Sequence, residues 1–88
     1  MTSTAVTPPS NLRATNVTSG QIDMAWLNNA DNATGIVVER SADGTTFSAI
    51  DTLPPDAATY TDYPPGQGRY HYRVRTVNAS GGAVSNTI

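Results

Sequence analysis

The sequence contains no cysteine and no lysine, and only 14% of its 88 residues are charged. Without cysteine, neither a disulfide bond nor a thiolate metal site can support the core, so stability must come from packing and hydrogen bonds. The net charge of −2 argues against the broad basic surface that nucleic-acid binding requires. No apolar run approaches the length of a membrane span. We therefore expect neither a nucleic-acid partner nor membrane insertion.

A signal-peptide pattern is also missing from residues 1–7, which lack a charged region followed by an apolar one. Their composition is typical of a flexible linker. The remaining residues, 8–88, are enough for one small domain, which buries roughly 60 to 65% of the surface that its unfolded chain exposes. We expect a monomer of modest stability.

The longest clean alternation of side chains occurs at residues 69–77. One face carries Tyr70, Tyr72, Val74 and Thr76, and the other carries His71, Arg73, Arg75 and Val77. Because alternate residues of a strand point to opposite faces, this pattern predicts a central antiparallel strand. Its aromatic and aliphatic face should pack inward, and its basic face should point to solvent or a partner.

Six further segments have strand character and are separated by turn signals. They comprise a first strand with Leu12 and Ala14 facing inward, followed by residues 21–26, 35–41, 45–51, 59–62 and 83–88. No stretch has the periodicity of a helix. Seven short strands with regular turns predict a β-sandwich or a small barrel. The Cys-Trp-Cys framework of an immunoglobulin domain is missing, and the only tryptophan, Trp26, lies on the second strand.

A series of motifs runs in order along the chain. They are Pro9 with Leu12, Ile22-x-Met24-x-Trp26, residues 35–44 followed by Phe47, Tyr60-Thr61-Asp62, Pro65-Gly66, Tyr70-x-Tyr72-x-Val74, Asn78-Ala79-x-Gly81 and Ser85-Asn86. Together these motifs resemble a fibronectin type III domain along nearly the whole chain. The segment from Gly35 to Gly44 is similar to the hairpin of type III modules attached to secreted bacterial enzymes.

This resemblance implies an all-β, seven-stranded, immunoglobulin-like sandwich with one sheet of strands A, B and E and another of strands C′, C, F and G. The expected core consists of Leu12, Ile22, Met24, Trp26, Ile36, Val38, Tyr60, Tyr70, Tyr72 and Val74. Tyr70 would be the tyrosine-corner residue, with its hydroxyl bonded to backbone a few positions upstream. Glu39 on strand C would point outward and pair with Arg73 or Arg75. Such an exposed pair contributes about 0.2 to 1 kcal/mol.

No combination of residues indicates catalysis, a metal or a cofactor, and we expect none. His71 is the only histidine and has neither a nucleophile nor a second metal ligand at a known spacing, so we interpret it as a solvated strand position. Residues 28–34 offer several oxygen donors but not the spaced pattern of a calcium loop, so we interpret them as a turn. A surface stripe of aromatic residues, as in carbohydrate-binding modules, is not evident.

Two functional hypotheses follow. The first is a non-enzymatic spacer module of a secreted bacterial multidomain protein, such as a polysaccharide-degrading enzyme, whose partners are the neighbouring domains. The second is a binding module, natural or engineered, that recognises a protein or polysaccharide through the loops at 28–34 and 78–82 or through the basic face. The candidate binding residues are Asn29, Asp31, Asn32, Arg73, Arg75, Asn78 and Ser80.

Overall fold

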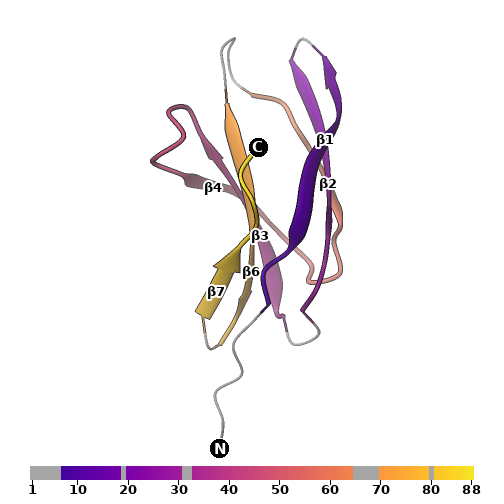
Figure 1. The fold of residues 1–88 in the computed structure, drawn as a ribbon, viewed down its shortest axis with the longest axis vertical. Helices are drawn as coiled ribbons and strands as arrows, with labels where there is room; N and C mark the ends of the chain where they lie inside the picture. The colour runs from indigo at the N-terminus through magenta and orange to yellow at the C-terminus, as the bar shows by residue number, and fades with distance from the viewer. Residues whose placement is uncertain (1–6, 19, 31–32, 65–69, 80) are drawn as a thin grey trace, which may run out of the picture.

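Seven β-strands and no helix are present in the part of the chain that the computed structural model describes, residues 7–18, 20–30, 33–64, 70–79 and 81–88 (Figure 1). The strands are β1 (Ser10–Thr18), β2 (Gln21–Leu27), β3 (Gly35–Ser41), β4 (Ser48–Leu53), β5 (Thr59–Asp62), β6 (His71–Asn78) and β7 (Gly81–Val84). Within these ranges no helix is long and apolar enough to cross a membrane.

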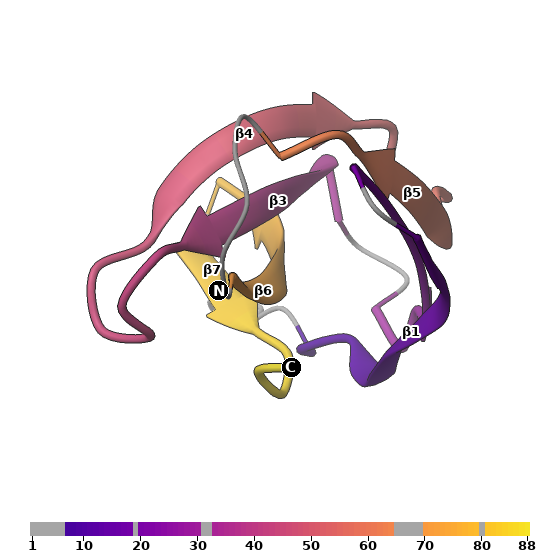
Figure 2. The same cartoon turned by 90° about the horizontal axis from the view of Figure 1, so that it is seen from above.

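The strands form two antiparallel sheets that face each other. One has the order β1-β2-β5 and the other the order β4-β3-β6-β7, and the view from above in Figure 2 shows the space between them. This order corresponds to the predicted sheets A-B-E and C′-C-F-G. The seven-stranded sandwich of fibronectin type III topology is therefore confirmed, with β6 as a central strand between β3 and β7.

The core fills the space between the sheets with the inward residues of β2, β3 and β6. Its buried members are Leu12, Met24, Trp26, Ile36, Val38, Tyr72 and Val74, and Ile22, Tyr60 and Tyr70 pack against them as partly buried residues. The indole nitrogen of Trp26 donates hydrogen bonds to Asn28 Oδ1 and to the carbonyl oxygen of Ala57, each at 3.1 Å. The ring of the single tryptophan is thus buried in the core, and its indole nitrogen is hydrogen-bonded.

Polar side chains join the two sheets on both open sides of the sandwich. On the β5 side, Asp62 Oδ2 accepts hydrogen bonds from Arg40 of β3 at 2.8 Å and from the hydroxyl of Tyr72 of β6 at 2.6 Å. On the β1 side, the amide of Asn86 accepts a bond from the Leu12 backbone nitrogen and donates one to the Leu12 carbonyl, both at 3.0 Å. These contacts connect sheets that no disulfide links.

The first strand differs from the prediction because Ala14 is exposed rather than inward. Register shifts lie between Ser10 and Arg13 and again between Ala14 and Asn16 in the pairing of β1 with β2. Each irregularity interrupts the alternation of side chains. Consequently Leu12 is the one buried residue of β1.

The fourth and seventh strands also have different bounds from those expected. Residues 45–47 belong to a turn instead of β4, because Asp43 Oδ1 accepts hydrogen bonds from the backbone nitrogens of Thr45 and Thr46. The last strand ends at Val84, where the Ser85 hydroxyl accepts the bond from the backbone nitrogen of Val74 and interrupts the regular ladder.

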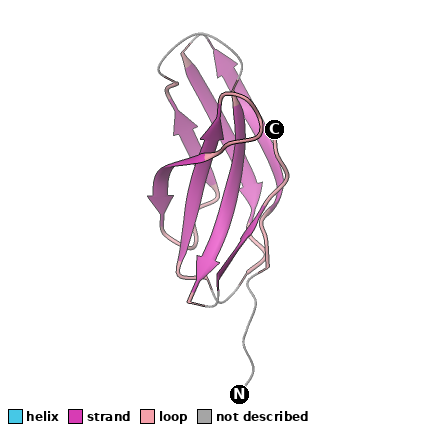
Figure 3. Cartoon of the chain, turned by 90° about the vertical axis from the view of Figure 1, so that its left-hand side faces the viewer, coloured by secondary structure: helices cyan, strands magenta, loops and turns pink. Residues whose placement is uncertain are grey.

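Residues 85–88 nevertheless stay attached to β6. Ile88 exchanges two backbone hydrogen bonds of 3.0 Å with Tyr72, near the start of β6. Ser10 lies opposite Leu27, at the end of β2. The first strand therefore begins at one end of the sandwich, and Ile88 lies toward the other end (Figure 1, Figure 3).

Two predictions concern segments outside the described residues. The linker assigned to residues 1–7 falls almost wholly in 1–6, and the backbone a few positions upstream of Tyr70 includes 65–69. The tyrosine corner therefore stays a prediction. Tyr70 itself precedes β6 and is half-buried, with the guanidinium carbon of Arg40 located 5.5 Å from its ring centre.

Candidate functional site

The outer face of β3 and β6 carries a three-residue charge network. Glu39 lies directly opposite Arg73 in the strand pairing. Its Oε1 accepts a hydrogen bond from Arg73 Nε at 2.5 Å, and its Oε2 accepts one from Arg75 Nη2 at 2.8 Å. The predicted pairing of Glu39 across to strand β6 is thus present, and it involves both arginines. We call Glu39, Arg73 and Arg75 the arginine face.

The prediction that this pair is exposed is wrong, because Glu39 is only 5% exposed. The aromatic ring of Phe47, at the end of the β3–β4 turn, lies 4.1 Å from the guanidinium carbon of Arg73. Arg73 therefore contacts both the ring and the Glu39 carboxylate. A buried carboxylate depends on its charged partners much more than an exposed one does.

Arg75 occupies the opposite side of Glu39, above β7. A Cβ atom at Gly82 would lie 2.8 Å from Arg75 Cδ and 3.1 Å from Val77 Cγ1, so the glycine leaves room for the arginine stem. The side chain of Arg75 is 41% exposed. Its buried Nε has no hydrogen-bond partner in the structure, and only one of its Nη groups contacts Glu39. Arg75 thus keeps N–H donors that Glu39 does not use.

His71 also lies on the outer face, but it is half-buried rather than freely solvated. A Cβ atom at Gly44, whose φ is 80°, would lie 3.2 to 3.3 Å from three atoms of the imidazole ring. The histidine therefore packs against the turn that joins β3 to β4. Among the described residues no group of three or more His, Cys, Asp or Glu side chains could hold a metal ion.

That turn is organised by Asp43 and Ser41. The Ser41 hydroxyl oxygen accepts hydrogen bonds from the backbone nitrogens of Asp43 and Gly44, and the Ser41 hydroxyl donates one to Asp43 Oδ1. Hydrogen bonds from the backbone nitrogens of Thr46 and Thr45, followed by the one from Ser41, lower the pKa of the Asp43 carboxyl to about 2. The ordered turn positions Phe47 over the arginine face.

The polar loops predicted to bind a partner lie at one end of the sandwich. Thr34 donates a backbone hydrogen bond of 2.8 Å to the carbonyl of Val77, which brings the β2–β3 connection next to the end of β6. Asn29 donates hydrogen bonds to the carbonyl of Pro8 and to the hydroxyl of Ser10, both at 3.0 Å, so its amide ties the first strand to this loop. Asn78 ends β6 opposite Gly81.

The other candidate loop residues, Asp31, Asn32 and Ser80, lie outside the described residues. The structure therefore brings together Arg73 and Arg75 among the seven candidate binding residues, through Glu39. Asn29 has a separate role at the start of the domain.

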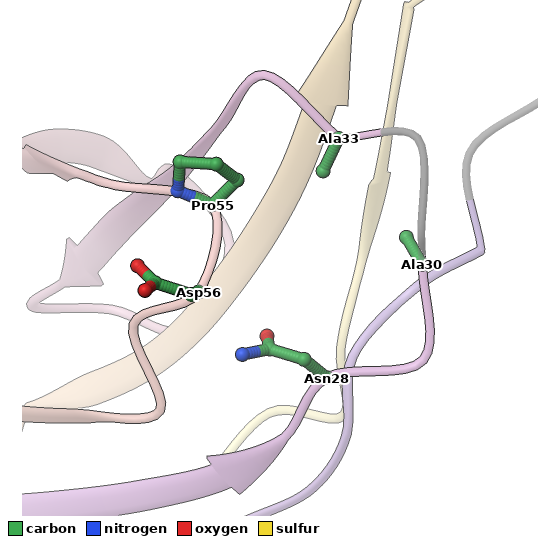
Figure 4. A pocket seen from close by; sticks show the side chains of 5 residues that line it. All are labelled: Asn28, Ala30, Ala33, Pro55 and Asp56. Carbon is green, nitrogen blue, oxygen red and sulfur yellow. The ribbon is translucent and has the colours of Figure 1, made fainter.

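A shallow hollow lies beside the connection between β2 and β3 (Figure 4). It is lined by Asn28, Ala30, Ala33, Pro55 and Asp56. The amide of Asn28 already has partners. Its oxygen accepts a hydrogen bond from the indole nitrogen of Trp26, and its nitrogen donates one to the Ala57 carbonyl at 2.7 Å. Among the described residues of the lining, Asp56 is the single titratable one, so these residues form no acid–base pair.

Sequence reasoning did not identify Asp62 as a buried charge. The residue belongs to the recognised Tyr60-Thr61-Asp62 motif, but its partners Arg40 and Tyr72 come from two other strands. Burial, and then the hydrogen bond to Asp62, raise the pKa of the Tyr72 hydroxyl above its usual value. Both side chains belong to the packing between the sheets.

No known family model and no curated protein matches this sequence. Among solved structures, the chain is similar to an Fn3-like protein from Clostridium thermocellum, with 28% sequence identity and a TM-score of 0.75, over 96% of this chain and 90% of that one. It is also similar to a β-1,2-glucanase from Parabacteroides distasonis, with 26% identity and a TM-score of 0.77, over 94% of this chain.

A third similar structure is a pectate lyase from Pectobacterium carotovorum, with 24% identity and a TM-score of 0.80, over 92% of this chain. The chain spans 12% of the glucanase and 26% of the pectate lyase. Its counterpart in each enzyme is therefore a small part of a longer polypeptide.

Proposed function

We propose that this chain, which has the fold of a fibronectin type III domain, is a non-catalytic spacer module that orients other domains within a secreted bacterial multidomain protein, such as a carbohydrate-active enzyme. The observation that carries this proposal is the placement of the two ends of the domain. Ser10 lies at the end of β2, whereas Ile88 pairs with the start of β6. A domain entered at one end and left toward the other separates its neighbours by its own length.

The comparisons support this proposal through the enzymes in which a similar domain occurs. A segment of this fold makes up 12% of the glucanase polypeptide and 26% of the pectate lyase polypeptide. In such a protein the partners of the module are the neighbouring domains. We propose residues 8–88 as the folded unit and residues 1–7 as the linker that precedes it.

The connection between the first strand and the C-terminal segment also suits a spacer. Asn86 holds the backbone of Leu12 with two hydrogen bonds that run in opposite directions. When neighbouring domains pull on the two ends, these bonds and the pairing of Ile88 with Tyr72 share the load. A spacer held in this way keeps a defined length, whereas a Gly/Ser linker of the same number of residues samples a broad range of distances.

The spacer role can be tested by placing residues 8–88 between two labelled reporter domains and measuring the distribution of distances between the labels. We expect a narrow distribution for the module and a broad one for a Gly/Ser linker of equal length. In a parent enzyme, deletion of the module should alter the separation of its domains or the activity on insoluble substrate. Unchanged geometry, secretion and activity after deletion would rule out the spacer role.

One observation favours a second candidate function, that of a binding module. Arg75 has a buried Nε without a partner, and its side chain is 41% exposed on the outer face of a sheet. Arginine in this setting is well suited to an anionic group of a protein or polysaccharide. An array of proteins and glycans that gives no signal above background would remove this candidate.

A further inference from the structure

The arginine face has a local excess of positive charge on a domain whose net charge is −2. Two guanidinium groups, those of Arg73 and Arg75, meet the single carboxylate of Glu39. Each carboxylate oxygen already accepts one charged hydrogen bond. One positive charge is therefore left over at this point of the sheet, and it lies where solvent has access.

Both guanidinium groups are fixed before any ligand arrives. Arg73 is held by its Nε bond to Glu39 and by the ring of Phe47. Arg75 is held by one Nη bond and by its stem, which lies against Gly82. Since long side chains normally lose conformational freedom on binding, side chains already ordered by the fold bind a ligand with a smaller entropic penalty.

The donors that remain point to a carboxylate as the ligand group. A guanidinium has five N–H donors, and each arginine gives one of them to Glu39. Arg73 and Arg75 are 27% and 41% exposed, respectively. Free donors on a planar guanidinium match the two oxygens of a carboxylate in a bidentate contact.

The spacing of the two arginines favours an extended peptide over a sugar. Arg73 and Arg75 are two residues apart on β6, so they repeat at roughly 7 Å, which is also the repeat of alternate side chains in an extended peptide. The aromatic ring of Phe47 lies beside them and is stacked on Arg73. The face of this ring that Arg73 covers is therefore not free for the stacking contacts that neutral sugars use.

We propose that the arginine face binds an extended acidic peptide segment whose carboxylates occur at alternate positions, one received by Arg75 and the next by Arg73. The segment lies along the outer face of β6, with the stem of Arg75 and the side chain of Val84 beside it, since Val84 pairs with Arg75. This binding does not depend on the spacer role, because it needs only the outer face of one sheet.

The test uses a fluorescein-labelled decapeptide of alternating Glu and Thr, with a peptide of alternating Gln and Thr as the control. Fluorescence anisotropy with the whole chain should detect binding of the Glu peptide, weakened severalfold between 20 and 200 mM NaCl because exposed charges are screened. Arg75→Gln should weaken binding about tenfold, which is the effect of losing one strong charged contact. Arg13→Gln is the matched control: it removes the same charge from exposed β1 and should leave binding unchanged.

Four outcomes of the binding measurements would overturn the proposal. They are equal binding of the Glu and Gln peptides, equal loss in the Arg13 and Arg75 variants, no binding of either peptide, and binding of polygalacturonate in place of the Glu peptide. Because Arg75→Gln could disturb the fold, amide chemical shifts of the unaltered protein provide a second measurement. Titration with the Glu peptide should shift residues of β6 and β7, and shifts confined to other strands would equally overturn the assignment.

Discussion

The hydroxyl of Tyr72 and the carboxylate of Asp62 form a hydrogen bond of 2.6 Å that crosses from one sheet to the other. The same carboxylate oxygen accepts a bond from Arg40 at 2.8 Å. Three strands of the two sheets therefore meet at a single buried oxygen. In a domain without disulfides, such a junction makes the relative position of the sheets depend on a few polar atoms.

Replacement of Tyr72 by phenylalanine keeps the aromatic ring and removes this crossing bond. Because a hydrogen bond to a charged group contributes about 1.5 to 3 kcal/mol, we expect Tyr72→Phe to lower the free energy of unfolding by that amount. Urea denaturation measures the change. Tyr63→Phe is the control, since Tyr63 is 67% exposed. Equal stability of the two variants would contradict the role assigned to the Tyr72 hydroxyl.

Replacement of Glu39 by glutamine tests the burial of the charge network. The variant leaves Arg73 and Arg75 without their carboxylate, although both arginines can regain some water. We expect a loss of about 1 to 3 kcal/mol in unfolding free energy, which is larger than the effect of an exposed pair. The measurement is again urea denaturation. A loss below about 0.5 kcal/mol would place Glu39 with ordinary surface pairs.

Asp43 should contribute a specific part of the acid sensitivity. Its pKa in the folded domain is about 2, below the usual 3.8, so the ionised form is favoured by folding. Its stabilising contribution is therefore present above about pH 4 and is lost as the pH falls through about 2. Thermal melting between pH 2 and 5 should show a shallower decline for Asp43→Asn than for the unaltered domain.

Removal of the Asn86 amide should release the first strand selectively. Asn86→Ala deletes both hydrogen bonds to Leu12, each of which contributes about 1 kcal/mol. We expect backbone amides of β1 to exchange with deuterium about tenfold faster or more, while amides of β3 and β6 are little affected. Thr87→Ala, a neighbouring exposed position, serves as the control. Uniform acceleration across all strands would mean that the amide supports the whole fold instead of β1.

The sequence predicted those parts of the fold in which each strand obeys a simple alternation. The inward placement of Tyr72 and Val74, and of Met24 and Trp26, follows from a period of two and from the size of the side chains. The inward placement predicted for Ala14 was wrong because β1 contains two register shifts, and no residue type in the sequence indicates where such shifts occur. β4 begins later than predicted because the Asp43 carboxylate accepts hydrogen bonds from the backbone nitrogens of Thr45 and Thr46, which keeps these residues in the turn.

The candidate site was predictable in its composition but not in its burial. The pairing of Glu39 with β6 follows from the antiparallel arrangement of β3 and β6. Its burial was not predicted, and neither was the stacking of Arg73 on Phe47, whose position is set by a turn and not by strand periodicity. The free donors of Arg75 depend in turn on the missing side chain at Gly82, which no pattern within β6 reveals.

The attachment of residues 85–88 sets a rule for where this module can be cut. The last strand ends at Val84, yet Asn86 holds Leu12 and Ile88 completes the pairing with Tyr72. Truncation after Val84 would keep all seven strands and still expose the Leu12 backbone and part of the core. A fusion joint placed directly after Val84 would therefore remove these contacts, so residues 85–88 have to be kept with the seven strands.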